Sequence, residues 1–488
     1  MDATGVLANL APAELWRHFA ALSAIPRPPG GEQAALEYVR SLAKERGAGW
    51  RQDDMGNLVV FVNGAPGPTV VVQAHLDMVC ERDPGVEHDF TADPIKVARD
   101  GSKVFAEGTT LGADNGIGAA AALALLTSDD IRHGPLELLF TVQEETGLHG
   151  AMGFDATLLQ GKLLINLDSE DPTELTVGCA GGATIEVRPG LDWEPAPEGW
   201  VGRELVVSGL QGGHSGVDID QPRGNAIKVL LAVLSGLRTA LELRLCGLEG
   251  GRAHNVIPRE ATAHIIVSPG SAGRLDDVVT SIADTLTSEW AGKEPGLSVN
   301  LTEIPAPAQA LTAGSEDRLL GFLTEVPHGP LERSESFPEK VETSANLAQV
   351  RVGPEESILV SSVRSLSAHR LFRTRTAIST AGLKIGAKVE VVDSYPGWEP
   401  DLESELLKLA AEQYEAVNGR PASIQVIHAG LECGVLVSKK PDMQAISFGP
   451  LITGAHSPNE QVDAGTVDAM WRLLVGMLGA LVEEPADK

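Results

Sequence analysis

The sequence contains few residues of several kinds, and each shortage narrows the class of protein. Only 4% of its 488 residues are aromatic, and its four cysteines are widely scattered, with no CxxC pair. This spacing argues against a disulfide-rich secreted domain, so we expect reduced thiols. No apolar run is long enough to cross a bilayer, and the first residues lack a basic segment followed by a hydrophobic core. We therefore expect a cytoplasmic protein.

Positive charge is also scarce. The chain has 38 Lys and Arg residues against 67 Asp and Glu residues, which gives a formal net charge of -29. An excess of negative charge repels phosphates and anionic lipids, so we expect neither nucleic acid nor a membrane as partner. The same excess is compatible with the binding of divalent cations.

Apolar residues make up 43% of the chain and occur in short runs. A chain of 488 residues exceeds what one hydrophobic core usually supports, so we expect two domains, one of which could be interrupted by an insert. In the N-terminal part, patterns typical of helices alternate with β-rich runs. The helical patterns lie at 12–25, 31–46 and 119–128, and the β-rich runs at 57–64, 68–75, 136–143 and 162–168. This alternation predicts an α/β fold with a mostly parallel, mixed sheet flanked by helices.

The middle of the chain has a different pattern. Residues 187–201 are rich in Pro and Gly, which indicates an exit from the first domain. Beyond them, the expected order of strand, helix, strand, strand, helix and strand over 203–304 is that of a ferredoxin-like α+β unit. A second set over 356–395 leaves a tandem insert open, although no clear sequence repeat is present. The first pattern returns from about residue 401.

Several acidic and histidine side chains follow apolar runs. They lie in the segments VVVQAHLD, GTTLGADNG, FTVQEETG and LLINLDSE, and are His75, Asp77, Asp114, Glu144, Glu145 and Asp168. The carboxyl ends of strands in an open α/β sheet converge on one crevice. Carboxylates and imidazoles gathered there need a cation to offset their repulsion and desolvation. The pattern therefore predicts a two-metal hydrolase, although Asp114 alone would fit a helix cap and Asp77 a turn.

A series of motifs in fixed order covers nearly the whole length: HLDMV, GTTLGADNGIG, EETGLHGA, NLDSED, GCAGG, GGHSG and HAGLECG. In this, the chain resembles the PepD-type Xaa-His (aminoacyl-histidine) dipeptidases of the di-zinc metallopeptidase superfamily. The resemblance implies a discontinuous catalytic domain at 1–187 and 390–488, with an inserted lid domain at 188–389. It also implies two divalent metal ions, Zn²⁺ first, with Co²⁺ or Mn²⁺ as substitutes.

The resemblance implies five metal ligands in this sequence. His75 and Asp168 resemble ligands of the first ion, Asp114 the carboxylate that bridges both ions, and Glu145 and His456 the remaining ligands of the second. Three carboxylates against four positive charges leave room for one hydroxide between the metals. Such a metal-bridged hydroxide would attack the scissile carbonyl.

Two further residues resemble groups that serve the metals indirectly. Asp77 resembles the carboxylate that orients the imidazole of His75. Glu144 resembles the general base that takes the proton of the water and passes it to the leaving amine. Adjacent residues of a strand point to opposite faces, so Glu144 and Glu145 can act together only where the strand bends or ends, as the following Thr146 and Gly147 suggest.

Three positions in the insert resemble substrate-binding residues more loosely. His214 resembles a lid histidine that stabilises the oxyanion, Asn255 a lid asparagine, and Arg364 an arginine that binds the free carboxylate of a dipeptide. A loop His or Asn often only forms a turn, and a strand Arg is often an ion-pair partner. Because the lid histidine of some relatives acts across a dimer interface, a homodimer is left open.

These residues predict metal-dependent hydrolysis of unblocked dipeptides, and the resemblance alone points to Xaa-His substrates, including β-alanyl-histidine. Two alternatives stay open. A carboxypeptidase or an N-acyl-amino-acid deacylase would use the same metals and base. A non-catalytic metal-dependent binding protein would need the ligands but not Glu144. The GADNGIG segment is not a nucleotide loop, because it lacks the GK[ST] ending.

Overall fold

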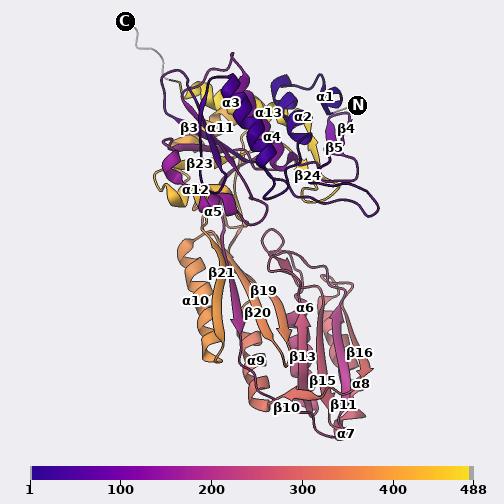
Figure 1. Cartoon of the computed structure of the whole chain (residues 1–488). Coiled ribbons are helices and arrows are strands. Elements are labelled where there is room, and N and C mark those ends of the chain that lie inside the picture. Colours follow the sequence, from indigo (N-terminus) through magenta and orange to yellow (C-terminus); the bar gives the residue numbers. More distant parts are fainter. Residues whose placement is uncertain (1–2, 483–488) are drawn as a thin grey trace. The chain divides into compact units, whose positions relative to one another are not determined.

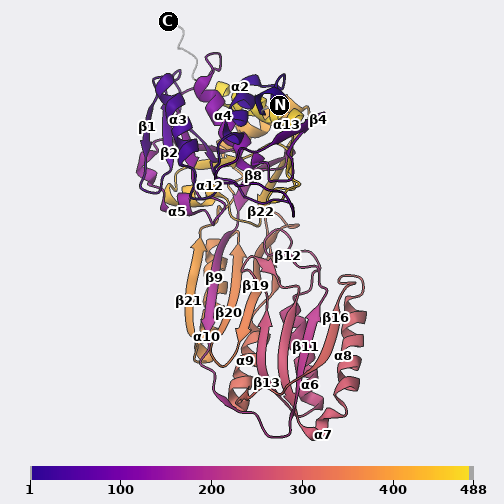
Figure 2. The same ribbon diagram turned by 45° about the vertical axis from the view of Figure 1, so that its right-hand side comes forward.

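The computed structural model describes residues 3–482 and divides into two compact units. Unit 1 comprises the chain up to Cys179, residues Trp398–Val426 and the chain from Leu431 onward. Unit 2 comprises Ala180–Gly397 and Ile427–Gly430. Figures 1 and 2 show the elements of each unit.

Unit 1 contains an eight-stranded mixed sheet with the order β1-β2-β6-β3-β7-β23-β8-β22. Its strands are β1 (Gly49–Gln52), β2 (Leu58–Val62), β3 (Val70–His75), β6 (Leu136–Thr141), β7 (Leu163–Asn166), β8 (Glu174–Cys179), β22 (Ser423–Ile427) and β23 (Gln444–Ser447). Pairing is parallel between β6 and β3, β3 and β7, and β7 and β23, and antiparallel between β2 and β6 and between β23 and β8. The predicted mixed sheet is confirmed, with its described parallel pairs confined to four central strands.

Every residue of β3 and β6 is buried, so both faces of the central part of this sheet are covered. The helices of unit 1 are α1 (Ala3–Leu7), α2 (Ala13–Ser23), α3 (Gln33–Glu45), α4 (Ala113–Thr127), α5 (His149–Gly153), α11 (Glu405–Asn418), α12 (Glu432–Lys439) and α13 (Ala464–Ala480). A smaller sheet contains β4 (Val97–Asp100), β5 (Lys103–Ala106), β24 (Ile452–Thr453) and β25 (Gln461–Asp463). Within residues 3–482, no helix is long and apolar enough to cross a membrane.

Unit 2 contains a nine-stranded sheet with the order β16-β11-β15-β13-β19-β20-β9-β21, and β18 pairs with β19 outside this path. Its strands are β9 (Gly181–Arg188), β11 (Val201–Ser208), β13 (Leu243–Gly250), β15 (Ala261–Val267), β16 (Ser298–Ile304), β18 (Gly329–Arg333), β19 (Val341–Val352), β20 (Ser357–Ser365) and β21 (Lys388–Tyr395). The helices α6 (Ala226–Ala240), α8 (Leu275–Trp290), α9 (Ala313–Glu325) and α10 (Ala368–Lys384) pack along it, and α7 (Pro269–Ala272) is a single turn. Two short pairs complete the unit, β10 (Trp193–Pro195) with β17 (Gln309–Leu311) and β12 (Gly213–His214) with β14 (Val256–Ile257).

Two ferredoxin-like sets stand side by side in this sheet. The first runs β11-α6-β13-β15-α8-β16 along the chain, and its strands have the spatial order β16-β11-β15-β13. The second uses β9, α9, β19, β20, α10 and β21, with the order β19-β20-β9-β21. The pairing of β13 with β19 joins the two sets, so the tandem arrangement that the sequence left open is present.

The unit boundaries differ from the sequence-based ones. The predicted boundaries at 187/188 and 389/390 fall inside β9 and β21, which pair with each other, while β9 also pairs with β20. The unit therefore begins at Ala180 and continues to Gly397. The Pro- and Gly-rich segment after β9 therefore connects two strands of unit 2 and is not the exit from unit 1. The sequence did not indicate this, because an apolar strand pattern does not reveal which sheet the strand joins.

Candidate metal centre

The central strands of unit 1 place several acidic and histidine residues at one edge of the sheet. His75 is the last residue of β3 and lies opposite Thr141, the last residue of the parallel strand β6. β7 ends at Asn166, two residues before Asp168. Because these strands are parallel, their carboxyl ends meet at the same edge, and the convergence expected from the sequence is present.

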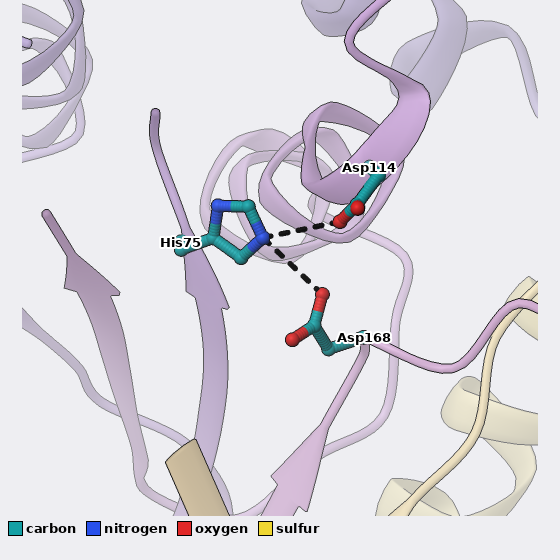
Figure 3. A group of neighbouring side chains, drawn as sticks. All are labelled: His75, Asp114 and Asp168. Atoms are coloured by element: carbon teal, nitrogen blue, oxygen red, sulfur yellow. Dashed lines mark hydrogen bonds and ion pairs between the residues drawn. The ribbon is translucent and has the colours of Figure 1, made fainter. Parts of the chain in front are cut away.

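The first group of side chains surrounds the imidazole of His75. Its Nε2 atom lies 3.1 Å from Oδ1 of Asp114 and 3.4 Å from Oδ1 of Asp168 (Figure 3). The His75 residue is only 1% exposed. One ligand atom of each of these residues lies within 4.8 Å of the others, so the three could hold one metal ion.

A second group uses the other oxygen of the same aspartate. Oδ2 of Asp114 lies 3.1 Å from Nε2 of His456, and that nitrogen lies 3.2 Å from Oε2 of Glu145. These three residues also meet the spacing for a metal ion, as do His75, Glu144 and Glu145. Asp114 therefore presents one oxygen to each of two imidazoles, which is the arrangement of a carboxylate shared by two ions.

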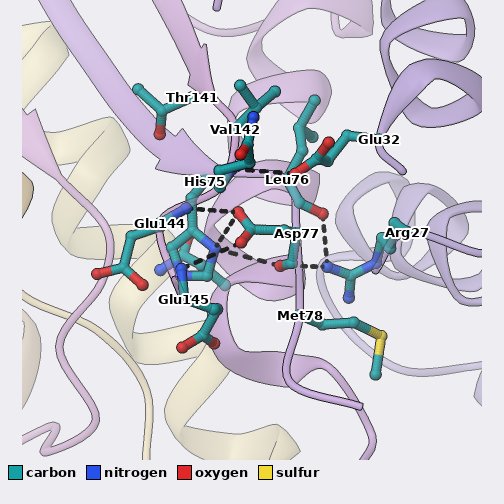
Figure 4. A network of polar contacts seen from close by, with 12 residues as sticks. Arg27, Glu32, His75, Leu76, Asp77, Met78, Thr141, Val142, Glu144 and Glu145 are labelled. Carbon is teal, nitrogen blue, oxygen red and sulfur yellow. Dashed lines mark hydrogen bonds and ion pairs between the residues drawn. The ribbon is translucent and has the colours of Figure 1, made fainter. Parts of the chain in front are cut away.

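Asp77 lies behind His75 and also contacts the turn that carries the two glutamates. Nδ1 of His75 is 3.2 Å from the carbonyl oxygen of Asp77 and 3.5 Å from its Oδ1. The carboxylate accepts the backbone N–H groups of Glu144 and Glu145, each at 3.1 Å (Figure 4). The two glutamates follow the end of β6, and Gln143 has a φ of 52°, so the strand has ended before them, as the sequence required.

The cluster contains more carboxylates than imidazoles, and their mutual contacts and burial shift the pKa values of these side chains. Burial raises the pKa of Glu144 well above its ordinary value and that of Asp168 to about 6. Hydrogen bonds to Asp114 and then to Glu145 raise the pKa of His456 to about 11. Burial alone would raise the pKa of Asp114, but the hydrogen bonds of His456 and His75 keep it below its ordinary value. A bound cation would take the place of the protons that these groups otherwise retain.

The donor set fits a divalent metal. Imidazole nitrogens and carboxylate oxygens are the ligands that Zn²⁺ and neighbouring first-row ions accept. Oε1 of Glu145 is buried and has no hydrogen-bond partner among the described residues. A buried oxygen without a partner is costly, and coordination of a cation would satisfy it.

Three buried residues hold this cluster from behind. The HAGLECG motif predicts a supporting role near the site for Glu432, which accepts hydrogen bonds from Thr141 Oγ1 at 2.7 Å and from Gln73. Arg27 and Glu460 bind backbone groups of the segments that carry the candidate ligands. Their partners lie far away in sequence, so no local pattern indicated them.

The three insert residues lie in unit 2 and are described within it. His214 pairs with Val256 in the short β12–β14 ladder, and its Nδ1 accepts the N–H groups of Gly216 and Val217, each at 3.2 Å. Asn255 lies in the same region, since its carbonyl accepts the N–H of Ser215 at 2.8 Å.

Arg364 lies on β20 and donates from Nη1 to the hydroxyl of Tyr395 at 2.7 Å. Its Nε atom is buried without a partner in the described part of the chain. The proposed roles of Arg364, His214 and Asn255 in substrate binding stay predictions.

Comparison with known proteins supplies the family. The model of peptidase family M20/M25/M40 matches residues 71–480. The chain is 40% identical to the cytosol non-specific dipeptidase of Escherichia coli (strain K12) over 476 residues. The alignment covers 97% of this chain and 98% of that protein.

Solved structures agree with this placement. The aminoacylhistidine dipeptidase from Vibrio alginolyticus is 37% identical, with a TM-score of 0.88 over 98% of this chain and 99% of that one. A tripeptidase from Staphylococcus aureus, 16% identical with a TM-score of 0.56 over 97% and 99% of the two chains, shares the fold. Because the family match spans most of the chain and the Escherichia coli relative is similar over nearly its whole length, the chain belongs to the peptide-bond hydrolases of peptidase family M20/M25/M40.

Proposed function

We propose that this protein is a cytoplasmic, metal-dependent dipeptidase that hydrolyses unblocked dipeptides, with Xaa-His dipeptides, including β-alanyl-histidine, among its preferred substrates. The observation that carries the proposal is the position of Asp114, whose two carboxylate oxygens face His75 and His456, each within 3.1 Å. A similar protein of Escherichia coli is named a cytosol non-specific dipeptidase, which supports the location and dipeptides as the substrate class. The similar Vibrio alginolyticus structure is named an aminoacylhistidine dipeptidase, which supports the Xaa-His preference.

Two divalent ions would be held by the two groups that share Asp114. His75 and Asp168 would complete the first set of ligands, and Glu145 and His456 the second. Zn²⁺ suits these donors best, and Co²⁺ or Mn²⁺ would substitute. When bound, such ions polarise a scissile carbonyl and lower the pKa of water.

Glu144 is the residue we assign as general base. Its carboxylate lies within ligand distance of His75 and Glu145, yet it is absent from both groups that contain Asp114. Burial raises the pKa of Glu144, and bound cations beside it would lower this pKa again, so that the ionised carboxylate could accept a proton and later return it to the leaving amine. The two amide hydrogen bonds to Asp77 hold its backbone in place during both transfers.

Unit 2 would supply the contacts to substrate and act as the lid. The buried Nε of Arg364, which has no partner within residues 3–482, is suited to a carboxylate that arrives with the substrate. His214 would stabilise the oxyanion, and Asn255 would bind the substrate beside it. An enzyme that binds a free carboxylate in this way prefers dipeptides with an unmodified C-terminus.

The division of labour between metal ligand and base can be tested directly. We expect Glu144→Gln to retain two metal ions per chain and to lose turnover by about 10²–10⁴-fold, because only the proton acceptor is removed. We expect Asp114→Ala to lose metal as well. Metal content by mass spectrometry and hydrolysis of a dipeptide measure the two effects, and equal metal loss in both variants would contradict the assignment.

Substrate class is tested with a matched panel of compounds. Free dipeptides with different second residues, their N-acetylated forms and their C-terminal amides would be compared at equal metal occupancy. We expect the free forms to be cleaved, with Xaa-His among the fastest. Faster cleavage of the N-acetylated compounds would instead favour a deacylase or carboxypeptidase. Arg364→Lys should narrow the difference between free and amidated dipeptides, because a lysine cannot make the two-point contact of a guanidinium.

A further inference from the structure

Two oppositely charged side chains are buried near the candidate metal centre, and the proposed reaction uses neither of them. Arg27 and Glu460 are each only 2% exposed. Buried charges are costly unless hydrogen bonds and opposite charges compensate them, so a pair of this kind needs a reason to be there. Neither residue belongs to a candidate metal group among the described residues.

The carboxylate of Glu460 binds four consecutive backbone amides. Its Oε2 accepts the N–H groups of Leu111 at 2.7 Å and Gly112 at 2.9 Å. Its Oε1 accepts those of Ala113 at 2.7 Å and Asp114 at 3.2 Å. One side chain thus holds every amide of the segment that ends at the shared aspartate.

Arg27 binds the carbonyl oxygens of the same segment and of the segment after His75. Its Nη2 donates to the carbonyl of Gly112, and its Nη1 donates to those of Leu76 at 2.9 Å and Asp77 at 3.0 Å. Figure 4 shows the guanidinium beside the Leu76–Met78 backbone. The guanidinium therefore links the backbone that carries His75 to the backbone that carries Asp114.

The glycines of the GADNG motif make room for this arginine. A Cβ atom at Gly112 would lie 2.4 Å from Nη2 of Arg27, and one at Gly116 would lie 2.7 Å from it. Gly112 also has a φ of 69°, a conformation that other residues rarely adopt. The two glycines of this motif therefore leave the space that the guanidinium of Arg27 occupies.

We propose that Arg27 and Glu460 form a positioning clamp that sets the place of Asp114 relative to His75 and His456, and so sets the affinity of both metal groups. The inference rests on the proposed function, since it takes Asp114 as the shared ligand. Because both imidazoles lie 3.1 Å from this one carboxylate, a small shift of its backbone changes both groups at once.

The test replaces one oxygen of each of two comparable buried carboxylates. Glu460→Gln keeps the shape of the side chain but exchanges an acceptor for an NH₂ group, which cannot accept the amides it faces. The control is Glu137→Gln, because Glu137 is also 2% exposed, accepts the amides of Gln160 and Gly161 at 2.9–3.0 Å, and lies near the opposite end of β6 from the site.

We expect Glu460→Gln to weaken metal affinity by about 10–100-fold and to change the visible absorption spectrum of the Co²⁺-loaded protein. We expect Glu137→Gln to leave both properties as in the original protein. Affinity would be measured by competition with a chromophoric chelator, and the stability of the metal-free forms by urea unfolding. A merely structural role would lower stability in both variants without altering the Co²⁺ spectrum.

A second variant covers the case in which Glu460→Gln does not fold. Arg27→Lys retains the charge but reaches fewer of the three carbonyls, so we expect a change in the same direction. Unchanged affinity and spectrum in Arg27→Lys, and in Glu460→Gln if it folds, would overturn the clamp. Failure of the original protein to bind two ions would overturn the proposed function instead, so the two failures are distinguishable.

Discussion

Glu144 and Glu145 are neighbours in the chain, yet both contribute to one candidate group with His75. In a regular strand, their side chains would point to opposite faces. The strand ends at Thr141, and Gln143 adopts a positive φ, which frees the two residues from that alternation. Asp77 then holds both of their amides. The positions of the Glu144 and Glu145 side chains thus depend on the hydrogen bonds of their backbone amides to Asp77.

The protonation of His18 gives a prediction at the same scale. This residue is 0% exposed, and its nitrogens lie 2.8 Å from the hydroxyl of Tyr38 and 2.9 Å from that of Thr127. Burial lowers its pKa from 6.5 to about 4. The unfolded chain therefore takes up a proton at a higher pH than the folded chain, and the stability contributed by neutral His18 is complete above pH 6.5 and is lost as the pH falls towards 4.

His18→Gln removes this titration while keeping hydrogen-bonding groups. Between about pH 7.5 and about pH 5, we expect the variant to lose about 2 kcal/mol less unfolding free energy than the original protein does. Urea unfolding with a chelator present measures the difference without a contribution from metal loss. Parallel pH curves for the two proteins would show that folding does not lower the pKa of His18.

At the scale of elements, α4 shows how tertiary contacts reverse a local preference. Alanine in place of a helical glycine normally stabilises a protein by about 0.5–1 kcal/mol. Gly321 lies inside α9, and a Cβ atom added there would have no neighbouring atom within 4 Å, so Gly321→Ala should show this gain. Gly116 lies in α4, where the new Cβ would meet Arg27 Nη2 at 2.7 Å and Phe19 at 3.1 Å.

We therefore expect the same change at Gly116, which follows the non-helical backbone of Asp114 and Asn115 at the start of the regular part of α4, to destabilise the protein by about 1–3 kcal/mol. The unfolding midpoints of the two variants in urea, each against the original protein, provide the comparison. Stabilisation by Gly116→Ala would mean that Arg27 moves away without cost, and it would weaken the argument for a rigid clamp.

At the scale of the whole molecule, the candidate metal groups of the described residues are confined to one of the two units. All residues of the candidate groups lie in unit 1, while unit 2 has a hydrophobic core of its own that runs through both ferredoxin-like sets. A ligand stabilises the folded region that binds it, by about 2.7 kcal/mol at a concentration of 100 times its Kd.

Removal of metal should therefore act on one unit. We expect chelation to speed amide hydrogen exchange in residues 111–114 and 143–147 and to leave the central strands of unit 2, β13 and β15, unchanged. Exchange followed by mass spectrometry on the full chain, with and without metal, measures both regions. Equal acceleration in β13 and β15, or none in residues 111–114, would contradict this expectation.

Much of the element structure followed from local patterns. The second helix expected within residues 203–304 is observed as α8 (Leu275–Trp290), and all but the last residue of the helical pattern at 119–128 lies in α4. In contrast, α9 and β19 were not predicted. In β19, Thr343, Ser344 and Asn346 interrupt the apolar alternation. Apolar residues recur about every 3.6 residues in a helix and every two in a strand, so a short segment with a regular pattern is enough to predict its type of element.

Part of the gathering of the candidate site residues could also be predicted from the chain, because His75, Glu144 and Asp168 end or follow apolar strands whose carboxyl ends meet at one edge of the sheet. The sequence did not indicate which strands pair with one another or which distant side chains hydrogen-bond to a segment. The assignment of β9 to the sheet of unit 2 depends on its pairing with β20 and β21, and the hold of Glu460 on Asp114 joins residues 346 positions apart. The side chains of a short segment determine its local conformation and the chemistry available to it. Strand pairing and burial arise only when distant segments pack together, and that packing determines the position of Asp114.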